Sequence, residues 1–408
     1  MTAIRLAYRN LLRNKRRSIL TSLALAIAMM MMVFAFGMLD GMEEQSIRNF
    51  ISYDYAHMKA YLPGYLEEDF PGLDHAFTVP ESLLTLIEKE SNGATVTARL
   101  EMSGVVIHGS EETFVRVVGV DPKRDKEVFE TLETLSGGVT LSDDKEVALI
   151  GDRLARDLKI DIGEMATLMV RSAPGALNPR MLPIAGILRT GHPKVDQFSV
   201  YVPLSLAREM ALLPDGATEI AVLTKSKSTS PEVTAYLAKV LPELEWHTWV
   251  ALAKDFYSMI RFKRYGQAVM LGILALMAAV GIANTMVMSV HERTREIGAL
   301  RALGFTPRLI SRIFMLEGTM LGLAAGITGV ILGCILTAWS AIDGWSMERY
   351  GDMDIGVPIR DAIYPTIQPG SIAFSLVIAV LLALFASWGS ARMAGRGQVV
   401  RALREGKL

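Results

Sequence analysis

The stretch HERTREIGALRALGFTP at residues 291–307 is a short charged segment between two long apolar ones. Gly266–Val290 precedes it and Gly318–Ile342 follows it, and neither contains a charged residue. A membrane-spanning helix needs about 20 mostly apolar residues, so each apolar segment is long enough to cross a bilayer. The sequence therefore predicts two spanning helices joined by a short polar segment.

Two further apolar stretches lie towards the ends of the chain. Ile19–Leu39 follows a basic tail, and its 21 residues exceed the apolar region of roughly 7–15 residues found in signal peptides. We interpret it as an uncleaved membrane anchor. A fourth span lies within Ala362–Ala391 and starts near Ile372. The one cysteine, Cys334, falls in an apolar stretch, and a single cysteine excludes an intrachain disulfide.

Charge is divided unevenly along the chain, although the net charge is only −1. Residues 1–18, 291–317 and 392–408 together hold 16 basic and 4 acidic residues, whereas the rest of the chain holds 26 and 39. Cytoplasmic segments of membrane proteins are enriched in Lys and Arg. Four spans place the three basic segments on one side, so both termini are predicted to be cytoplasmic. The near-zero net charge argues against a nucleic-acid partner.

The predicted fold is a membrane protein with four transmembrane α-helices and a large α/β periplasmic domain between helices one and two. Arg261, Lys263 and Arg264 lie just outside the second span, against the charge pattern, and we interpret them as headgroup contacts or partners for domain acids. The predicted segments are an interfacial cytoplasmic helix (1–18), the first span (19–39), the periplasmic domain (40–265), the second span (266–290), a cytoplasmic coupling helix and loop (291–317), the third span (318–342), a short periplasmic loop (343–371), the fourth span (372–391) and a cytoplasmic tail (392–408).

The large domain has an α/β pattern. Apolar, β-branched runs predict strands at Ala94–Leu100, Val105–His108, Thr113–Val120, Met165–Val170, Leu182–Leu188, Phe198–Val202 and Ile220–Leu223. Helical patterns, three of them directly preceded by a proline, predict helices at Glu81–Glu90, Asp152–Leu158, Leu204–Leu212 and Glu232–Leu241. We expect a strand-rich lobe at about 94–203 and a membrane-proximal lobe formed by the flanks, 43–93 and 204–250.

Motifs for chemistry are missing from the sequence. The six histidines are scattered without metal-ligand spacing, and no HExxH or G-x-S-x-G motif is present. No phosphate-binding G-x-x-x-x-G-K-[ST] loop occurs either. We therefore expect no catalytic residue, no metal and no cofactor on this chain.

Residues 292–304 predict a short helix that stops at Gly304, a residue type favoured just beyond a helix end. Thr306 is expected to cap the next helix, with Pro307 as its first residue. Ile297, Leu300 and Leu303 fall near one face. The spacing alone leaves two interpretations open. The segment is either an interfacial helix with snorkelling arginines or a helix that docks into a groove on a cytoplasmic partner.

The chain resembles the FtsX-like permeases of ABC transporters, which include the MacB-type exporters and the lipoprotein-releasing LolC/LolE-type subunits. ERTREIGALRALG at 292–304, followed by Pro307 and a span, resembles the family's characteristic segment. Further stretches are similar to its basic entry helix, its periplasmic core and its lipoprotein-releasing branch, and they lie at 6–17, 147–151, 154–155, 162–164, 185–187, 190–191 and 196.

The resemblance implies a mechanism. A separate cytoplasmic ATPase dimer, which carries ATP and Mg²⁺, would bind the coupling helix and drive two permease subunits together, as a homodimer or a heterodimer. The periplasmic domains would then move the substrate mechanically. The ATPase-coupling residues on this chain would be Glu292, Arg293, Arg295, Glu296, Ile297, Leu300, Arg301, Leu303 and Gly304.

Small and flexible residues mark two of the spans. Glycines spaced for close helix packing in the third span are Gly318, Gly322, Gly326, Gly329 and Gly333. Adaptable methionines in the first span could contact acyl chains or simply face lipid, and they are Met29, Met30, Met31, Met32, Met38 and Met42. Glu317 borders the third span, where we expect it to pair with Arg312 or Arg308.

The loop 172–180 carries Pro174 and Pro179, and in lipoprotein-releasing permeases this place holds a hook that recruits a periplasmic chaperone. The expected function is a lipoprotein-releasing permease subunit in a bacterial inner membrane, with a lipoprotein substrate, a periplasmic carrier and membrane lipid as partners. Two alternatives remain, a MacB-type efflux permease with a periplasmic adaptor and an FtsX-like signalling module that controls a cell-wall hydrolase.

Overall fold

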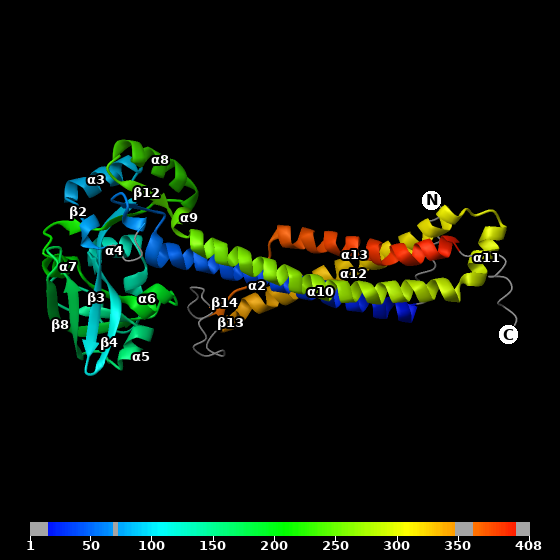
Figure 1. Cartoon of the computed structure of the whole chain (residues 1–408), viewed down its shortest axis with the longest axis horizontal. Coiled ribbons are helices and arrows are strands. Elements are labelled where there is room, and N and C mark those ends of the chain that lie inside the picture. The colour runs from blue at the N-terminus through cyan, green and yellow to red at the C-terminus, as the bar shows by residue number, and fades with distance from the viewer. Residues whose placement is uncertain (1–14, 68–71, 347–361, 397–408) are drawn as a thin grey trace. The chain divides into compact units, whose positions relative to one another are not determined.

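The computed structural model describes residues 15–67, 72–346 and 362–396 (Figure 1). The chain forms two compact units. The membrane unit comprises Met1–Glu43, Met259–Trp345 and Ile363–Leu408, and the globular unit comprises Glu44–Ser258 and Ser346–Ala362. Most of the predicted N-terminal interfacial helix, most of the predicted loop after the third span and most of the C-terminal tail lie outside the described residues.

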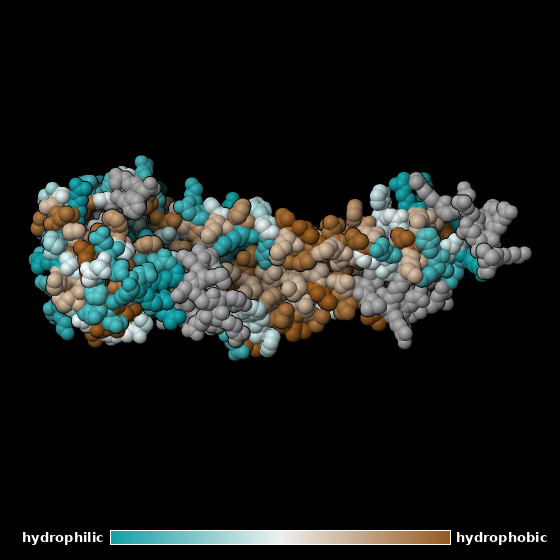
Figure 2. Space-filling model, turned by 60° about the horizontal axis from the view of Figure 1, so that its bottom comes forward, coloured by the Kyte–Doolittle hydropathy of each residue, from teal (hydrophilic) through white to brown (hydrophobic). Residues whose placement is uncertain are grey.

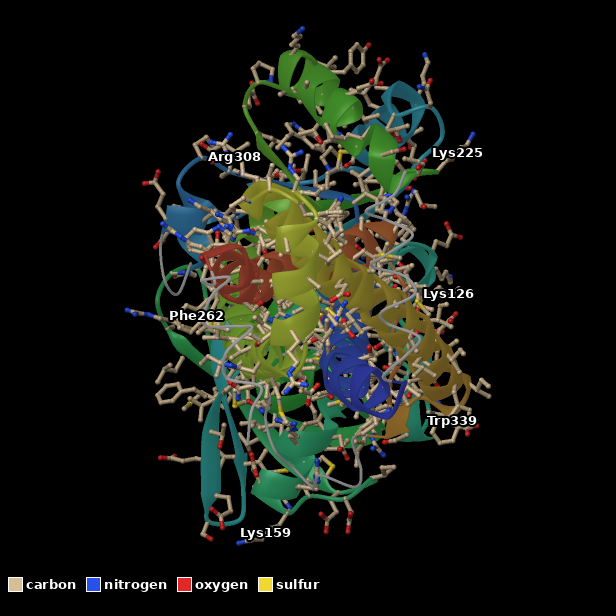
Figure 3. All side chains as sticks on the ribbon, turned by 90° about the vertical axis from the view of Figure 1, so that its right-hand side faces the viewer. Lys126, Lys159, Lys225, Phe262, Arg308 and Trp339 are labelled. Carbon is tan, nitrogen blue, oxygen red and sulfur yellow. The ribbon has the colours of Figure 1, made fainter. Side chains whose placement is uncertain are left out.

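Four long helices are long and apolar enough to cross a membrane among the described residues, which confirms the predicted fold class. They are α2 (Lys15–Phe50), α10 (Lys254–Glu292), α12 (Pro307–Asp343) and α13 (Pro369–Arg396). Figure 2 shows apolar side chains gathered over the middle stretch of these helices. Phe262 and Trp339, 79% and 69% exposed, point outward (Figure 3), as expected of side chains that face lipid.

Glycines let α12 approach two neighbouring helices closely. A Cβ atom added at Gly318, Gly322 or Gly326 would lie within 3 Å of a side-chain atom of α13. A Cβ added at Gly329 or Gly333 would lie within 3 Å of an atom of α2. Small residues in membrane helices allow such backbone approach, and the gain is van der Waals contact. The first three glycines therefore form a contact with α13, and the last two form a contact with α2.

The methionines of α2 have different surroundings. Met29 and Met32 are buried in the apolar core of the membrane unit, whereas Met31 is exposed. Met30, Met38 and Met42 are half-buried. The two buried methionines therefore pack against other helices.

The strand-rich part of the globular unit is a closed ring of six strands. Each strand pairs with the next in the order β3–β4–β9–β6–β8–β7, and β7 pairs back to β3. The strands are β3 (Thr95–His108), β4 (Glu111–Val120), β6 (Ala148–Gly151), β7 (Met165–Arg171), β8 (Leu177–Leu188) and β9 (Ser199–Pro203). Closure leaves few free sheet edges in this lobe. β5 (Leu135–Gly138) pairs with the end of β8.

The second lobe extends the sheet from β3 through β11 (Glu219–Leu223) and β1 (Met58–Tyr61) to β12 (Glu245–Thr248). A small separate sheet pairs β2 (Phe77–Thr78) with β10 (Gly216–Ala217). The helices α3 (Glu81–Glu90) and α8 (Ser230–Val240) contribute Leu84, Ile87 and Leu237 to an apolar core with Met58 and Trp246.

Short helices complete the unit, and two of them correspond to predicted helices, at 152–158 and 204–212. The short helices are α4 (Pro122–Val128), α5 (Asp152–Leu158), α6 (Pro193–Phe198), α7 (Leu204–Ala211), α9 (Trp249–Leu252) and the π-helical turn η1 (Ile51–Tyr55), with further single 3-10 turns. The bounds of α3 and α5 are those predicted. In contrast to the prediction, α7 packs into the core of the six-stranded ring, so that lobe continues past residue 203.

Two predictions for strands need correction. Residues 95–108 form one strand, because the charge that interrupts its apolar run, Glu101, is neutralised by Arg116 on β4 at 2.7 Å. The predicted loop 172–180 is a five-residue turn, and β8 begins at Leu177. Pro179 lies within β8, opposite Met169, where β8 pairs with β7 alone. A proline is tolerated there because that stretch has a free edge.

Candidate coupling segment and ionic clusters

The segment between α10 and α12 folds as a compact elbow. The helix α11 (Thr294–Ala302) starts after Arg293, whose backbone leaves the helical region. Gly304 has φ +93°, a left-handed conformation that suits glycine at a helix end. Thr306 then caps α12, because its Oγ1 accepts the Leu309 N–H at 3.3 Å, and Pro307 follows as the first helical residue. These turns confirm the predicted stop and restart.

Arg293 ties the elbow to α12. Its Nη1 donates to Glu317 Oε1 at 2.9 Å, and its Nε donates to Glu296 Oε2 at 3.0 Å. The guanidinium carbon also lies 5.4 Å from the centre of the Phe314 ring. The prediction that Glu317 pairs with Arg312 or Arg308 is wrong, because α11 folds back and brings Arg293 beside the buried carboxylate. The Arg293–Glu317 pair is charge-assisted and largely buried. It therefore holds the elbow and α12 in one arrangement.

A second arginine ties the elbow to α13. Arg301 Nη1 donates to the Gly395 carbonyl oxygen at 3.1 Å. That carbonyl lies in the last turn of α13, where helix carbonyls lack intrahelical partners and a cation is favoured. The elbow is therefore fixed to α12 through Arg293 and to α13 through Arg301.

The predicted apolar stripe of α11 is divided between two faces. Ile297 is 8% exposed and belongs to the core of the membrane unit. Leu300 is half-buried, whereas Leu303 is 78% exposed. Ala299 and Ala302 are also exposed. The accessible apolar patch of the elbow therefore consists of Ala299, Ala302 and Leu303, and Glu292 and Arg295 are exposed on the same segment.

A further arginine joins α10 to α2. Arg264 Nη2 donates to Asp40 Oδ1 at 2.7 Å and to Glu43 Oε2 at 2.5 Å. Ser371, on α13, donates to the other oxygen of Asp40 at 2.9 Å. Arg264 is therefore a partner for two carboxylates of α2. Three of the four long helices meet at this cluster.

The globular unit contains a buried ionic cluster centred on Asp54 of η1. Arg116 Nη1 lies 3.0 Å from Asp54, Lys194 Nζ lies 3.1 Å from it and Lys59 Nζ lies 4.0 Å away. Burial alone would raise the pKa of the Asp54 carboxyl, but the three cations hold this pKa well below its ordinary value. Asp54 is therefore a carboxylate at neutral pH, although no solvent reaches it.

Two more carboxylates neutralise the remaining charge of these cations. Glu219 accepts from Lys59 Nζ at 2.6 and 2.8 Å, and Glu101 accepts from Arg116. Burial raises the pKa of Glu219 despite Lys59. Nearby, Arg99 forms a two-pronged pair with Asp125 at 2.7 and 3.0 Å. The cluster thus joins η1, β1, β3, β4, β11 and α6 through paired charges.

His192 lies at the edge of the cluster and stays neutral. Burial is the largest cause that lowers the pKa of its imidazole to about 4; Asp54 opposes this shift, and Lys194, Arg116 and Lys59 add to it. Its ring packs edge-on against Phe50, with 4.9 Å between ring centres.

Sequence reasoning did not find this cluster. The available signal was a set of charged residues at inward-facing positions of otherwise apolar strands, such as Lys59 in MKAY and Glu219 in EIAVL. Such residues are seldom buried without partners. Their pairing needs the fold, because Lys59 and Glu219 are 160 residues apart.

No group of three or more potential metal ligands occurs among the described residues. The elbow and the clusters hold elements together and present surfaces, and we assign no reaction to them. Pro174 lies in the β7–β8 turn and Pro179 in β8 itself.

Comparison with known proteins agrees with this architecture. A family model for the MacB-like periplasmic core domain matches residues 18–240, and one for the FtsX-like permease C-terminal region matches residues 268–399. The lipoprotein-releasing system transmembrane protein LolC of Xylella fastidiosa is 23% identical over 94% of this chain and 95% of its own. An uncharacterized ABC transporter permease of Methanocaldococcus jannaschii is 25% identical over 82% of this chain and 83% of its own.

Among solved structures, the periplasmic region of MacB from Actinobacillus actinomycetemcomitans covers 52% of this chain and 98% of its own. Its TM-score is 0.36 and its sequence identity is 12%.

Four spanning helices, a large domain between the first two and a short elbow between the middle two define a permease subunit of an ABC transporter. The chain belongs to the FtsX-like permease family with a MacB-like periplasmic core domain. Membership implies an ATPase partner and a second permease subunit.

Proposed function

We propose that this chain is the permease subunit of an ATP-driven complex that releases lipoproteins from the inner membrane towards the outer membrane. ATP and Mg²⁺ bind to the separate ATPase subunit, and both termini of this chain lie in the cytoplasm. The observation that carries the proposal is the elbow, in which α11 is fixed to two helices and still exposes an apolar patch at Ala299, Ala302 and Leu303. An exposed helix face on a rigid support suits a partner that must push on the bundle.

Movement of the elbow reaches the other helices through close contacts. The Arg293–Glu317 pair transmits the movement of the elbow to α12. The close contacts at the glycines of α12 transmit this movement to α13 and α2. Such contacts transmit displacement well because interiors are densely packed. The permease works as a lever in this mechanism, and the ATPase partner supplies the energy.

The choice of a lipoprotein substrate rests on similarity to LolC along nearly the whole chain and on the adaptable methionines of α2. A MacB-type export permease is the second candidate, because the MacB-like core model covers residues 18–240.

Mass spectrometry of the complex purified in mild detergent tests the choice. An ABC ATPase should co-purify under every candidate function, so the third component decides. An acylated protein supports the proposed function, and a long coiled-coil adaptor without one supports the MacB-type function. A cell-wall hydrolase or its activator in place of both would contradict both and support a signalling role.

A further inference from the structure

One end of the membrane unit has a basic hollow of about 370 Å³ between the start of α12 and the end of α13. Its lining residues are Pro307, Arg308, Ser311, Arg312, Arg392 and Gly395. The side chains of Arg308, Arg312 and Arg392 are all exposed. Figure 3 views the molecule from this end and labels Arg308. Three guanidinium groups therefore line one small concave surface.

These three arginines differ from the structural arginines of the same unit. Arg264 and Arg293 are each held by two carboxylates. Within the described part of the chain, Arg308, Arg312 and Arg392 form no ion pair, and the guanidinium carbon of Arg392 lies 5.7 Å from the centre of the Trp388 ring. Guanidinium groups match phosphate oxygens well because they donate two parallel hydrogen bonds. The hollow is therefore complementary to an anion.

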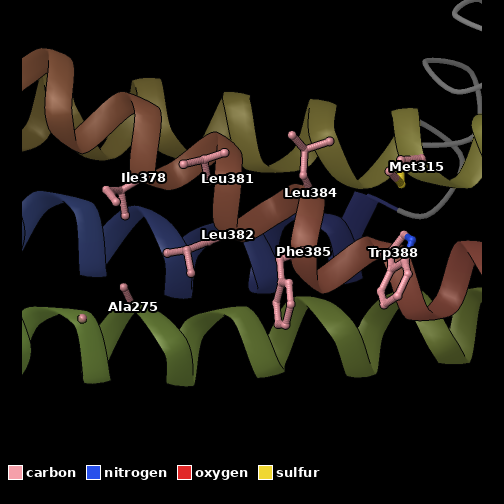
Figure 4. Close-up of a pocket in the computed structure, with 9 residues that line it drawn as sticks. Ala275, Met315, Ile378, Leu381, Leu382, Leu384, Phe385 and Trp388 are labelled. Carbon is pink, nitrogen blue, oxygen red and sulfur yellow. The ribbon is translucent and has the colours of Figure 1, made fainter.

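An apolar groove of about 590 Å³ runs along α13, the helix that also lines the hollow. Leu381, Leu382, Phe385 and Trp388 form one wall, and Ala275 of α10 and Met315 of α12 are among the other lining residues (Figure 4). The two sites are neighbours, because the guanidinium carbon of Arg392, which lines the hollow, lies 5.7 Å from the centre of the Trp388 ring, which lines the groove. Arg308, Arg312 and Met315 likewise follow one stripe of α12, three and four residues apart.

The length of the groove fits one leaflet of a membrane. From Ile378 to Trp388 the helix rises by roughly 15 Å at about 1.5 Å per residue. Half of the hydrocarbon thickness of a bilayer is also roughly 15 Å. An acyl chain that enters beside the arginines would therefore end near the middle of the bilayer.

We propose that an anionic phospholipid binds here, with its headgroup phosphate against Arg308, Arg312 and Arg392 and one acyl chain in the groove between α10 and α13. This site shares no lining residue with the elbow patch. Basic pockets between membrane helices bind anionic headgroups in general. The bound acyl chain covers the groove in which α10, α12 and α13 meet.

The test uses the full chain purified in detergent and native mass spectrometry with phosphatidylglycerol or phosphatidylcholine of identical acyl chains. We expect the wild-type chain to retain phosphatidylglycerol in preference. The variant R308Q/R312Q/R392Q should bind it roughly a hundredfold more weakly, since each basic residue near a headgroup contributes about fivefold. The control K254Q/R261Q/K263Q removes the same charge towards the other end of α10 and should bind as the wild type does.

A second pair of variants tests the groove without changing any charge. A Cβ at Gly272, which lines the groove, or at Gly281, which does not, meets no atom within 4 Å. Gly272→Phe should therefore fill the groove and weaken phosphatidylglycerol binding, whereas Gly281→Phe should leave binding unchanged.

Three results would overturn the proposal. If the wild-type chain retained phosphatidylglycerol and phosphatidylcholine equally, the arginines would not select an anionic headgroup. Equal binding by Gly272→Phe and Gly281→Phe would remove the acyl-chain assignment. Displacement of the lipid by millimolar inorganic phosphate alone would show that the arginines hold a free anion.

Discussion

Acidification from pH 7 to pH 4 should destabilise the globular unit through His192. This side chain is 3% exposed, and both ring nitrogens lack a hydrogen-bond partner among the described residues. The charged groups that face it are Lys194, Arg116, Lys59 and Asp54, and burial is the largest cause of its lowered pKa. The folded protein therefore keeps the imidazole neutral where the unfolded chain would protonate it.

The magnitude follows from the two pKa values. The pKa of the imidazole falls from 6.5 in the unfolded chain to about 4 in the folded protein. One pKa unit corresponds to about 1.4 kcal/mol, so protonation of the buried His192 lowers the free energy of unfolding by roughly 3 kcal/mol in total. Above pH 6.5 the imidazole is neutral in both states and this loss is absent. The loss grows progressively as the pH falls from 6.5 to about 4.

Urea unfolding of the full chain in detergent, followed by hydrogen exchange in peptides from β4 and β9, measures this loss at pH 7, 5.5 and 4. His192→Gln removes the titrating group and should flatten most of the pH dependence. The pKa of His57 is also lowered by burial, which leaves a smaller slope of the same sign. Replacing the exposed His291 with Gln is the matched control. If His192→Gln lost as much stability as the wild type over this range, the reasoning about burial would be refuted.

Three further predictions concern packing and transport. Asp54→Asn leaves buried cations uncompensated and should lower the free energy of unfolding of the globular unit by roughly 3–5 kcal/mol, as measured by urea unfolding. The control Glu111→Gln, at an exposed ion pair, should leave the unfolding midpoint unchanged. Gly322→Val places its Cβ about 2.0 Å from the Ala383 Cβ and should lower the melting temperature of the membrane unit; an equal effect from Gly281→Val, in open space, would contradict the packing argument. Met38→Gln should reduce lipoprotein release in reconstituted vesicles while the ATPase still co-purifies, and unchanged release would remove the proposed acyl-chain contact.

The sequence was sufficient for elements whose signal is local. Uninterrupted apolar stretches predicted all four long helices, although the helices extend beyond the apolar windows. The stop at Gly304 and the restart at Thr306 and Pro307 also follow from neighbouring residues. Local patterns succeed here because the backbone preferences of these residues act within one or two turns.

Features that depend on distant residues could not be predicted. The spacing of α11 grouped Ile297 with Leu303, but only the fold decides that the bundle covers Ile297 and leaves Leu303 in solvent. The partner of Glu317 depends on how α11 folds back. The cluster around Asp54 requires strands that are far apart in sequence, and each of its charges looks like a surface residue when read alone.

Binding of the co-purified ABC ATPase to the Leu303→Asp variant tests the central claim most directly, because that claim assigns the docking surface to the exposed patch of α11. The variant places a charge at the most exposed leucine of the elbow and leaves the contacts of Arg293 and Arg301 intact. Leu66→Asp, at an exposed leucine of the globular unit, is the matched control. We expect Leu303→Asp to abolish ATPase binding and Leu66→Asp to preserve it. Full ATPase binding by the Leu303→Asp chain would contradict the account.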